Sequence, residues 1–173
     1  SVIFETLWHV QKRRTVRRHK QEMLPTPKRF TLCAGAAEGS HKLNAFDNAL
    51  LEAGIGNLNL LKVSSILPPG AQYVEKLQMP PGSLIPTAYG SIVSDQAGEL
   101  ISAAVGVGLG KDTFGVIMEY SGKCSRVQAE DMIEEMVREA FRTRKLQLLR
   151  LMVKGVEHTV SQAGCAFAGV ALW

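Results

Sequence analysis

The feature that most limits how this chain can fold is a series of six or seven short apolar runs, each bounded by residues that favour turns. Runs of this length are typical of β-strands. They occupy residues 30–37, 58–63, 83–94, 99–109, 113–120, 146–158 and 164–173. Two further stretches have helical periodicity. Strands in series with single helices predict an α+β sandwich in which helices cover the faces of the sheets.

The first helical stretch is expected to begin at Asn44, a residue type that favours the N-cap position. Apolar residues recur behind it at helical spacing as far as Ala53. Asp47 then falls in the first turn, where a carboxylate interacts favourably with the helix dipole. The helix is expected to end at Gly54 or Gly56, because glycine readily adopts the conformation that closes a helix.

The second helix is predicted over residues 126–145. Ser125 and Gln128 have the spacing of a capping box, in which each side chain bonds to the other residue's backbone N–H. Apolar residues behind the cap form one stripe with a period of about 3.6 residues. The stripe consists of Ile133, Met136, Val137, Ala140 and Phe141. We interpret this stripe, methionine included, as the face that packs on a sheet.

Several sequence patterns that would identify a cofactor site are missing. The chain contains no P-loop, no HExxH and no CxxC, and none of its histidines is spaced like a metal ligand. Gly106, Gly108 and Gly110 alternate inside a predicted strand rather than forming a phosphate-binding loop. We interpret these glycines as small packing positions.

The positive charge of the chain lies in its leading segment. Residues 1–30 carry eight basic and two acidic residues, a net charge of +6, whereas the other 143 residues carry twelve basic and fourteen acidic residues, a net charge of −2. We therefore expect a basic, disordered N-terminal extension over residues 1–29, followed by one domain over residues 30–173. The domain lacks the charge that favours nucleic-acid binding, so we do not expect such a partner. Binding of nucleic acid through the extension alone stays open as an alternative.

The cysteines and the hydropathy pattern favour a protein of the cytoplasm. Cys33, Cys124 and Cys165 are far apart in the sequence and odd in number, so they predict neither a disulfide framework nor a zinc site. A reducing compartment is the simplest setting for them. No stretch approaches the roughly 18 uninterrupted apolar residues of a membrane span, so we expect no membrane partner.

Two adjacent serines, Ser64 and Ser65, follow the apolar run 58–63 and precede Pro68. In a bent backbone the Ser65 hydroxyl can attack the Ser64 carbonyl and replace the amide with an ester. β-Elimination then releases the upstream chain as a carboxylate, and the dehydroalanine left at position 65 hydrolyses to a pyruvoyl group and ammonia. The reaction needs a strained peptide and a donor for the oxyanion, and the Asn59 side-chain amide is a donor of the right kind.

Taken alone, the serine pair favours the simpler interpretation of a turn that ends a strand before two prolines. Longer stretches of the sequence favour the self-cleavage site over the turn. The chain resembles the pyruvoyl-dependent arginine decarboxylases from Thr31 to Trp173. The resemblance is carried by the stretches LNAFDNALLEAGIGNLNLLKVSSILPP, PTAYGSIVSDQAGELISAA, GVIMEYSGKCS and VEHTVSQAGCAFAGVALW. The basic extension lies outside the family's pattern.

The resemblance implies a self-processing enzyme that converts L-arginine to agmatine and CO2 through a Schiff base on a pyruvoyl group made from Ser65. Ser64 would end a β chain of residues 1–64, and an α chain would run over residues 65–173. It implies a covalent cofactor, with neither a metal nor pyridoxal phosphate. It also implies a four-layer αββα sandwich with two antiparallel or mixed sheets, assembled as a homotrimer or a trimer pair with active sites between protomers.

Single residues of the family's pattern can be matched to this chain. Asn59 matches an asparagine needed for self-cleavage, Glu119 a catalytic acid, and Asp47 an aspartate that recognises the guanidinium. The sequence supports the role of Glu119 independently, because it lies in an apolar strand where burial raises the pKa of a carboxyl. Such an acid can keep a proton for delivery to the substrate. Two alternatives stay open: the same chemistry on another amino acid, and an uncleaved, non-enzymatic paralogue.

Overall fold

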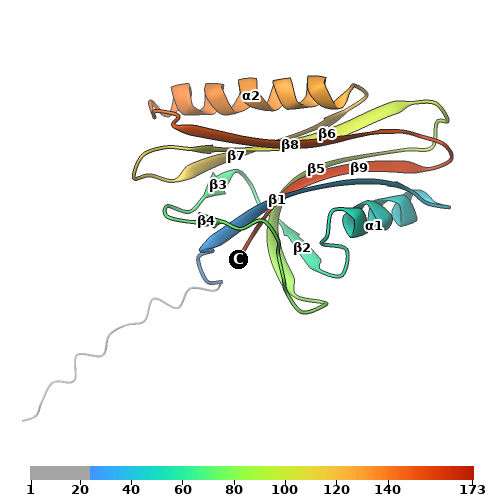
Figure 1. The fold of residues 1–173 in the computed structure, drawn as a ribbon, viewed down its shortest axis with the longest axis horizontal. Helices are drawn as coiled ribbons and strands as arrows, with labels where there is room; N and C mark the ends of the chain where they lie inside the picture. The colour runs from blue at the N-terminus through green and yellow to red at the C-terminus, as the bar shows by residue number, and fades with distance from the viewer. Residues whose placement is uncertain (1–23) are drawn as a thin grey trace, which may run out of the picture.

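The computed structural model describes residues 24–173, which form four layers (Figure 1). Helix α1 (Lys42–Glu52) covers the outer face of a five-stranded sheet, and helix α2 (Arg126–Thr143) covers the outer face of a four-stranded sheet. The two sheets pack against each other between the helices. The expected αββα sandwich is confirmed. Neither helix within residues 24–173 is long and apolar enough to cross a membrane.

The five-stranded sheet is mixed, with the strand order β2-β5-β9-β1-β4. Its strands are β1 (Arg29–Glu38), β2 (Asn59–Lys62), β4 (Gln72–Tyr73), β5 (Leu84–Ser94) and β9 (Gly164–Leu172). The long strands β1, β5 and β9 pair antiparallel, whereas the short strands β2 and β4 pair parallel at the two edges. Strand β9 is buried along its whole length, as its unbroken apolar sequence predicts.

The four-stranded sheet is antiparallel throughout, with the order β3-β7-β6-β8. Its strands are β3 (Ile66–Leu67), β6 (Leu100–Leu109), β7 (Gly115–Gly122) and β8 (Arg150–Thr159). Strands β3 and β4 have two residues each, too few to show a period in the sequence, and were not predicted. Strand β8 begins four residues later than expected because Leu146 and Leu148 pack beneath α2 instead.

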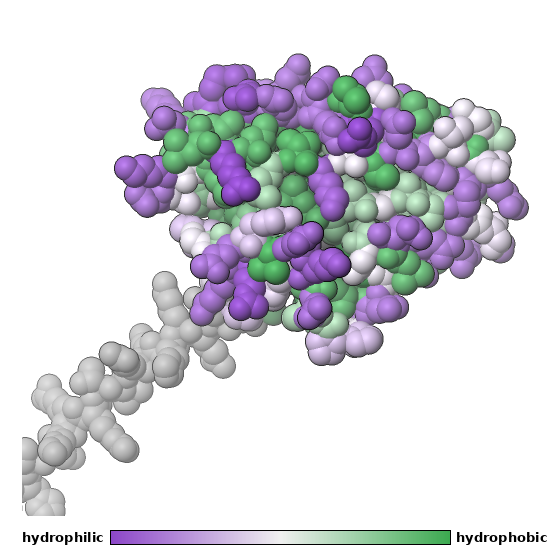
Figure 2. Space-filling model, viewed as in Figure 1, coloured by the Kyte–Doolittle hydropathy of each residue, from purple (hydrophilic) through white to green (hydrophobic). Residues whose placement is uncertain are grey.

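Small residues on β6 let α2 approach its sheet closely. A Cβ atom added to Gly108 would lie 2.5 Å from Cε2 of Phe141, and one added to Gly106 would collide with Ile133. Both glycines therefore lie directly beneath the apolar stripe of α2, and their interpretation as packing positions is confirmed. The opposite face of α2 meets solvent, and this layer is mostly hydrophilic at the top of the molecule in Figure 2.

The limits of the helices were predicted with unequal success. The capping box of Ser125 and Gln128 is present, and α2 ends two residues earlier than expected. Helix α1 ends beside Gly54, whose φ of +81° closes the helix as predicted. The predicted start at Asn44 is wrong, because the helix already begins at Lys42 and has no side-chain cap.

Packing replaces the missing cap of α1. A Cβ atom at Gly39 would lie 2.7 Å from the carbonyl carbon of Asn44, so the chain leaving β1 presses directly on the first turn. Asn48 donates a hydrogen bond of 2.9 Å to the carbonyl of Glu38 and ties the helix to the end of β1. Asp47 consequently lies in the second turn rather than the first.

The carboxylate of Glu38 fastens the end of β1 to the loop between β8 and β9. It accepts hydrogen bonds from the backbone N–H groups of Ser161, Gln162 and Ala163, at 2.9, 2.9 and 3.0 Å, and contacts Nε2 of His158 at 2.6 Å. Burial alone would raise the pKa of Glu38, but these hydrogen bonds outweigh it and lower the pKa to about 2.

We predict that Glu38→Gln lowers the free energy of unfolding at pH 7 by about 1–3 kcal/mol, since it removes charge-assisted hydrogen bonds. A depressed pKa in the folded state stabilises the protein above the ordinary pKa of about 4.5. This contribution is lost as the pH falls toward 2. Urea unfolding at fixed protein concentration should therefore show the difference between wild type and variant shrinking in acid. Glu139→Gln, on the exposed face of α2, is the control. An equal effect of both substitutions would contradict this assignment.

Candidate active site

The two serines lie where the chain crosses from one sheet to the other. Val63 extends the β2 ladder by donating its N–H to the Thr87 carbonyl at 3.2 Å, in the five-stranded sheet. The Ser65 carbonyl accepts a hydrogen bond of 2.7 Å from the N–H of Ile117, in the four-stranded sheet. Ser64 stands between these two fixed points and is exposed. The Ser64–Ser65 peptide is thus held on both sides by different sheets.

Glu119 faces the space between the sheets beside this crossing. It shares one face of β7 with Ile117, which is buried between the sheets, and with Ser121, whose hydroxyl donates a hydrogen bond of 3.0 Å to the Ser91 carbonyl on β5. A Cβ atom at Gly90 would lie 3.5 Å from Cβ of Glu119. The side chain of Glu119 therefore begins beneath β5, at van der Waals distance from position 90.

The carboxyl group of Glu119 is half-buried and incompletely satisfied. Its Oε2 atom is shielded from solvent and makes no hydrogen bond within the described part of the chain. Burial raises the pKa of Glu119, and the positive charge of Lys62 lowers it by a smaller amount. The rise predicted from the apolar strand is confirmed. Buried polar atoms are usually paired, so the free oxygen is suited to a group supplied from outside these residues.

Lys62 is a residue that the sequence analysis missed. It is the last residue of β2, two positions before Ser64, and its Nζ atom lies 4.6 Å from the centroid of the Tyr89 ring. Its neighbour Tyr89 comes from β5, far away in the sequence, and packs on the face of the sheet that α1 covers. Only the register of β2 on β5 reveals this arrangement, although a single charge in the apolar run 58–63 was a visible signal.

Asn59 lies at the opposite end of β2 from the serines. Its side-chain amide donates a hydrogen bond of 3.1 Å to the Gly82 carbonyl, and its backbone N–H bonds to Ser83 at 2.9 Å. The length of β2, about 10 Å of extended chain, and the crossing segment after it separate Asn59 from Ser65. The structure does not bring Asn59 to the Ser64–Ser65 peptide of the same chain.

Asp47 is exposed on α1, on the outer layer of the molecule. Glu119, in contrast, faces the interior between the two sheets. Since Asp47 lies beyond the first turn, its carboxylate has no capping role that would compete with ligand binding. Within one chain, Asp47 therefore lies in the outer helical layer, whereas Ser65 and Glu119 lie at the two sheets.

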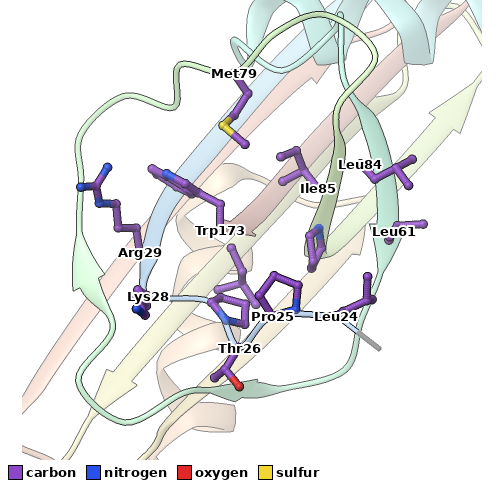
Figure 3. A pocket seen from close by; sticks show the side chains of 13 residues that line it. Leu24, Pro25, Thr26, Lys28, Arg29, Leu61, Met79, Leu84, Ile85 and Trp173 are labelled. Atoms are coloured by element: carbon purple, nitrogen blue, oxygen red, sulfur yellow. The ribbon is translucent and has the colours of Figure 1, made fainter. Parts of the chain in front are cut away.

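A cavity of about 490 Å³ lies elsewhere, between residues 24–29, the start of β5 and Trp173 (Figure 3). Its lining is mainly apolar, with Met79, Leu84 and Ile85 among the contributing side chains. It includes neither Ser65 nor Glu119, so we do not assign the chemistry to it. No group of His, Cys, Asp and Glu within residues 24–173 is arranged to hold a metal ion.

Comparisons with known proteins agree with the resemblance noted in the sequence. Residues 29–171 match a family model described as pyruvoyl-dependent arginine decarboxylase. A protein of that name from Methanocaldococcus jannaschii is 52% identical over 149 residues, which cover 85% of this chain and 90% of the relative. A protein of the same name from Thermococcus kodakarensis is 48% identical, over 84% of this chain and 94% of the relative. Another from Pyrococcus horikoshii is 47% identical, over 82% of this chain and 91% of the relative.

Proposed function

We propose, from the premise that this chain belongs to the pyruvoyl-dependent arginine decarboxylase family, that it cleaves itself before Ser65 and decarboxylates L-arginine to agmatine and CO2. The observation that carries the proposal is the position of Ser64 and Ser65 between two sheets, beside the half-buried carboxyl of Glu119, whose Oε2 atom has no hydrogen-bond partner among residues 24–173. An acid with a raised pKa next to a reactive serine suits a proton donor for a covalently held substrate.

The anchoring of the crossing segment supports the proposed self-cleavage. The hydroxyl oxygen of Ser65 attacks the carbonyl carbon of Ser64, and the C–N bond is exchanged for an ester. Elimination breaks the bond between Cβ and the ester oxygen of residue 65, so Ser64 leaves as a carboxylate. Water then replaces the nitrogen of residue 65, which departs as ammonia. The products are a β chain of residues 1–64 and an α chain of residues 65–173.

The residues around the crossing suit the group that this reaction produces. A pyruvoyl group at position 65 would supply a ketone that can bind an amino group and take up the electron pair released as CO2 leaves. Glu119 holds a proton at its carboxyl and delivers it to the former Cα. Its Oε2 atom has no hydrogen-bond partner among residues 24–173, so no such bond must be broken first.

We further propose that a second copy of the chain completes the site, in a homotrimer or a trimer pair. A guanidinium group is recognised best by a planar carboxylate, and Asp47 offers one on the surface of α1. Exposed apolar side chains lie close to both halves of the proposed site. Leu43 on α1 is 77% exposed, and Ile66, next to Ser65, is 46% exposed. A second subunit packed at these two places would bury both side chains.

The separation of Asn59 from the serines has the same consequence. If Asn59 assists cleavage, its amide must reach the Ser64 carbonyl of a neighbouring chain.

We place the enzyme in the cytoplasm, which suits its three free cysteines, Cys33, Cys124 and Cys165. Most of the basic extension, residues 1–23, lies outside the described part of the chain, and we assign it no part in the reaction.

Ser65→Ala is predicted to stay uncleaved and inactive, because no hydroxyl remains to attack the Ser64 carbonyl. Ser64→Ala is the matched comparison and should still cleave, since the attacked group belongs to its backbone. A denaturing gel distinguishes one band near 18.9 kDa from two smaller fragments. Two fragments from Ser65→Ala would disprove the proposed cleavage. A single band from the wild type would favour an uncleaved paralogue.

Glu119→Gln is predicted to fold and to release CO2 from arginine about 10²–10⁴-fold more slowly than the wild type, the range typical of a lost general acid. The rate should be measured on material whose α chain is shown to carry a ketone, so that a processing defect is not mistaken for a catalytic one. An undiminished rate would remove Glu119 from the decarboxylation.

Arginine is predicted to be turned over in preference to ornithine, lysine and aspartate. Asp47→Asn should raise KM for arginine about 10–100-fold, the loss expected when a charge-assisted hydrogen-bonded pair is broken. Initial rates on the four amino acids, with wild type and variant side by side, provide the comparison. Activity confined to aspartate would show that the chain performs the same chemistry on another substrate.

A further inference from the structure

Glu119 lies midway between two hydrogen bonds that hold β7 in place. The backbone N–H of Ile117 donates to the Ser65 carbonyl at 2.7 Å, and the Ser121 hydroxyl donates to the Ser91 carbonyl on β5 at 3.0 Å. We infer that Ser121 is a positioning residue for decarboxylation, whose hydrogen bond to β5 fixes the Glu119 carboxyl for proton delivery. The inference rests on the proposed function, because it takes Glu119 as the proton donor.

The Ser91 carbonyl is available to Ser121 because β5 extends beyond its neighbour β2. Along an extended strand, the backbone carbonyls point alternately to the two edges. The Thr87 carbonyl faces β2, since it accepts the N–H of Val63, and the Ser91 carbonyl four residues later faces the same edge. Strand β2 ends opposite Thr87, so beyond this point no strand of the described residues pairs with β5 on that edge. Ser121 therefore binds a carbonyl that a neighbouring strand would otherwise satisfy.

The backbones of β5 and β7 meet closely beside Glu119. A Cβ atom at Gly90 would lie 3.4 Å from the carbonyl carbon and oxygen of Tyr120, and 3.5 Å from Cβ of Glu119. The next residue of β5 is Ser91, which accepts the hydrogen bond from Ser121. Two adjacent residues of β5 thus contact β7 at Glu119 and at Ser121. The Ser121 hydrogen bond therefore fixes the separation of the two strands where the Glu119 side chain begins.

The Glu119 carboxyl depends on this support because its Oε2 atom has no bond of its own to direct it. That atom is shielded from solvent and makes no hydrogen bond within residues 24–173. Its position is consequently set by the backbone that carries it and by the groups packed around it. Anchors at Ile117 and Ser121, two residues to either side, limit the movement of that backbone.

The proposed cleavage makes the Ser121 anchor more important. A break between Ser64 and Ser65 removes the covalent connection from β2 to the segment bound by β7. Ser91 and Ser121 both belong to the α chain, so their hydrogen bond is retained after cleavage. It keeps β7 on β5 in the processed enzyme, where displacement of a reacting group by about 1 Å can lower the rate about 10²-fold.

The test uses three substitutions of Ser121. Ser121→Ala removes the hydroxyl oxygen, whereas Ser121→Thr and Ser121→Val have the same shape and only the threonine can donate the bond. In processed enzyme, the alanine and valine variants should lower kcat for arginine about 10–100-fold. KM should stay within about twofold of the wild type, because the proton donor is displaced and the bound substrate is not. Ser121→Thr should keep most of the wild-type kcat. Unchanged kcat in the alanine and valine variants, or a change confined to KM, would overturn the inference.

A double-mutant cycle distinguishes positioning of Glu119 from general stabilisation of the fold. In a Glu119→Gln background the proton donor is already lost, so adding Ser121→Ala should change kcat by less than about twofold. A second loss of full size in this background would overturn the inference, since Ser121 would then act without Glu119. If Glu119→Gln alone kept its full rate, the proposed proton donor would fail, and the inference with it.

A further measurement does not depend on cleavage. In the uncleaved Ser65→Ala background, amide hydrogen exchange can be followed at Met118 and Tyr120, which flank Glu119 and pair with β6. Exchange should be about 5-fold faster with Ser121→Val than with Ser121→Thr, the factor expected for one lost hydrogen bond. Equal exchange in these two variants would show that Ser121 does not anchor β7 and would overturn the inference.

Discussion

The structure of the site depends on one constraint, the passage of a single segment between two sheets. The hydrogen bonds of Val63 with Thr87 and of Ile117 with Ser65 hold the chain on either side of Ser64, so the peptide between them cannot relax independently of the sandwich. A serine in a free loop would sample many orientations, and few of them bring its hydroxyl to the preceding carbonyl. The same crossing brings Ser65 beside β7, the strand that carries Glu119.

Burial gives the carboxyl of Glu119 properties that the residue type alone does not have. The sheets exclude solvent from one of its oxygens, and this burial raises its pKa. The positive charge of Lys62 lowers this pKa by a smaller amount. Position 90 on β5 lies at van der Waals distance from the Cβ atom of Glu119, so the two sheets meet closely at this point. Asp47 and Asn59 lie apart from this group, which is why we propose that a second copy completes the site.

Sequence patterns predicted the layers of this fold because each long element has its own period. The apolar stripe of α2 predicted the face that packs on a sheet, and the small residues of β6 predicted a place for close packing. The two surfaces lie against each other in the structure, with Gly108 beneath Phe141. The start of α1 was missed because packing by Gly39 replaces a side-chain cap, and such packing leaves no local signal. Lys62 was missed for a related reason, since its neighbours become apparent only from the pairing of β2 with β5.

The central claim is that the chain makes its own ketone at position 65, and the mass of each fragment tests this most directly. The account predicts two chains, divided between Ser64 and Ser65, with the larger lacking the amino group of an N-terminal serine and carrying a carbonyl in its place. Borohydride in the presence of arginine should attach the amine product covalently to this larger chain. A single intact chain of 18.9 kDa, or a larger fragment that begins with unmodified serine and cannot be trapped, would contradict the account.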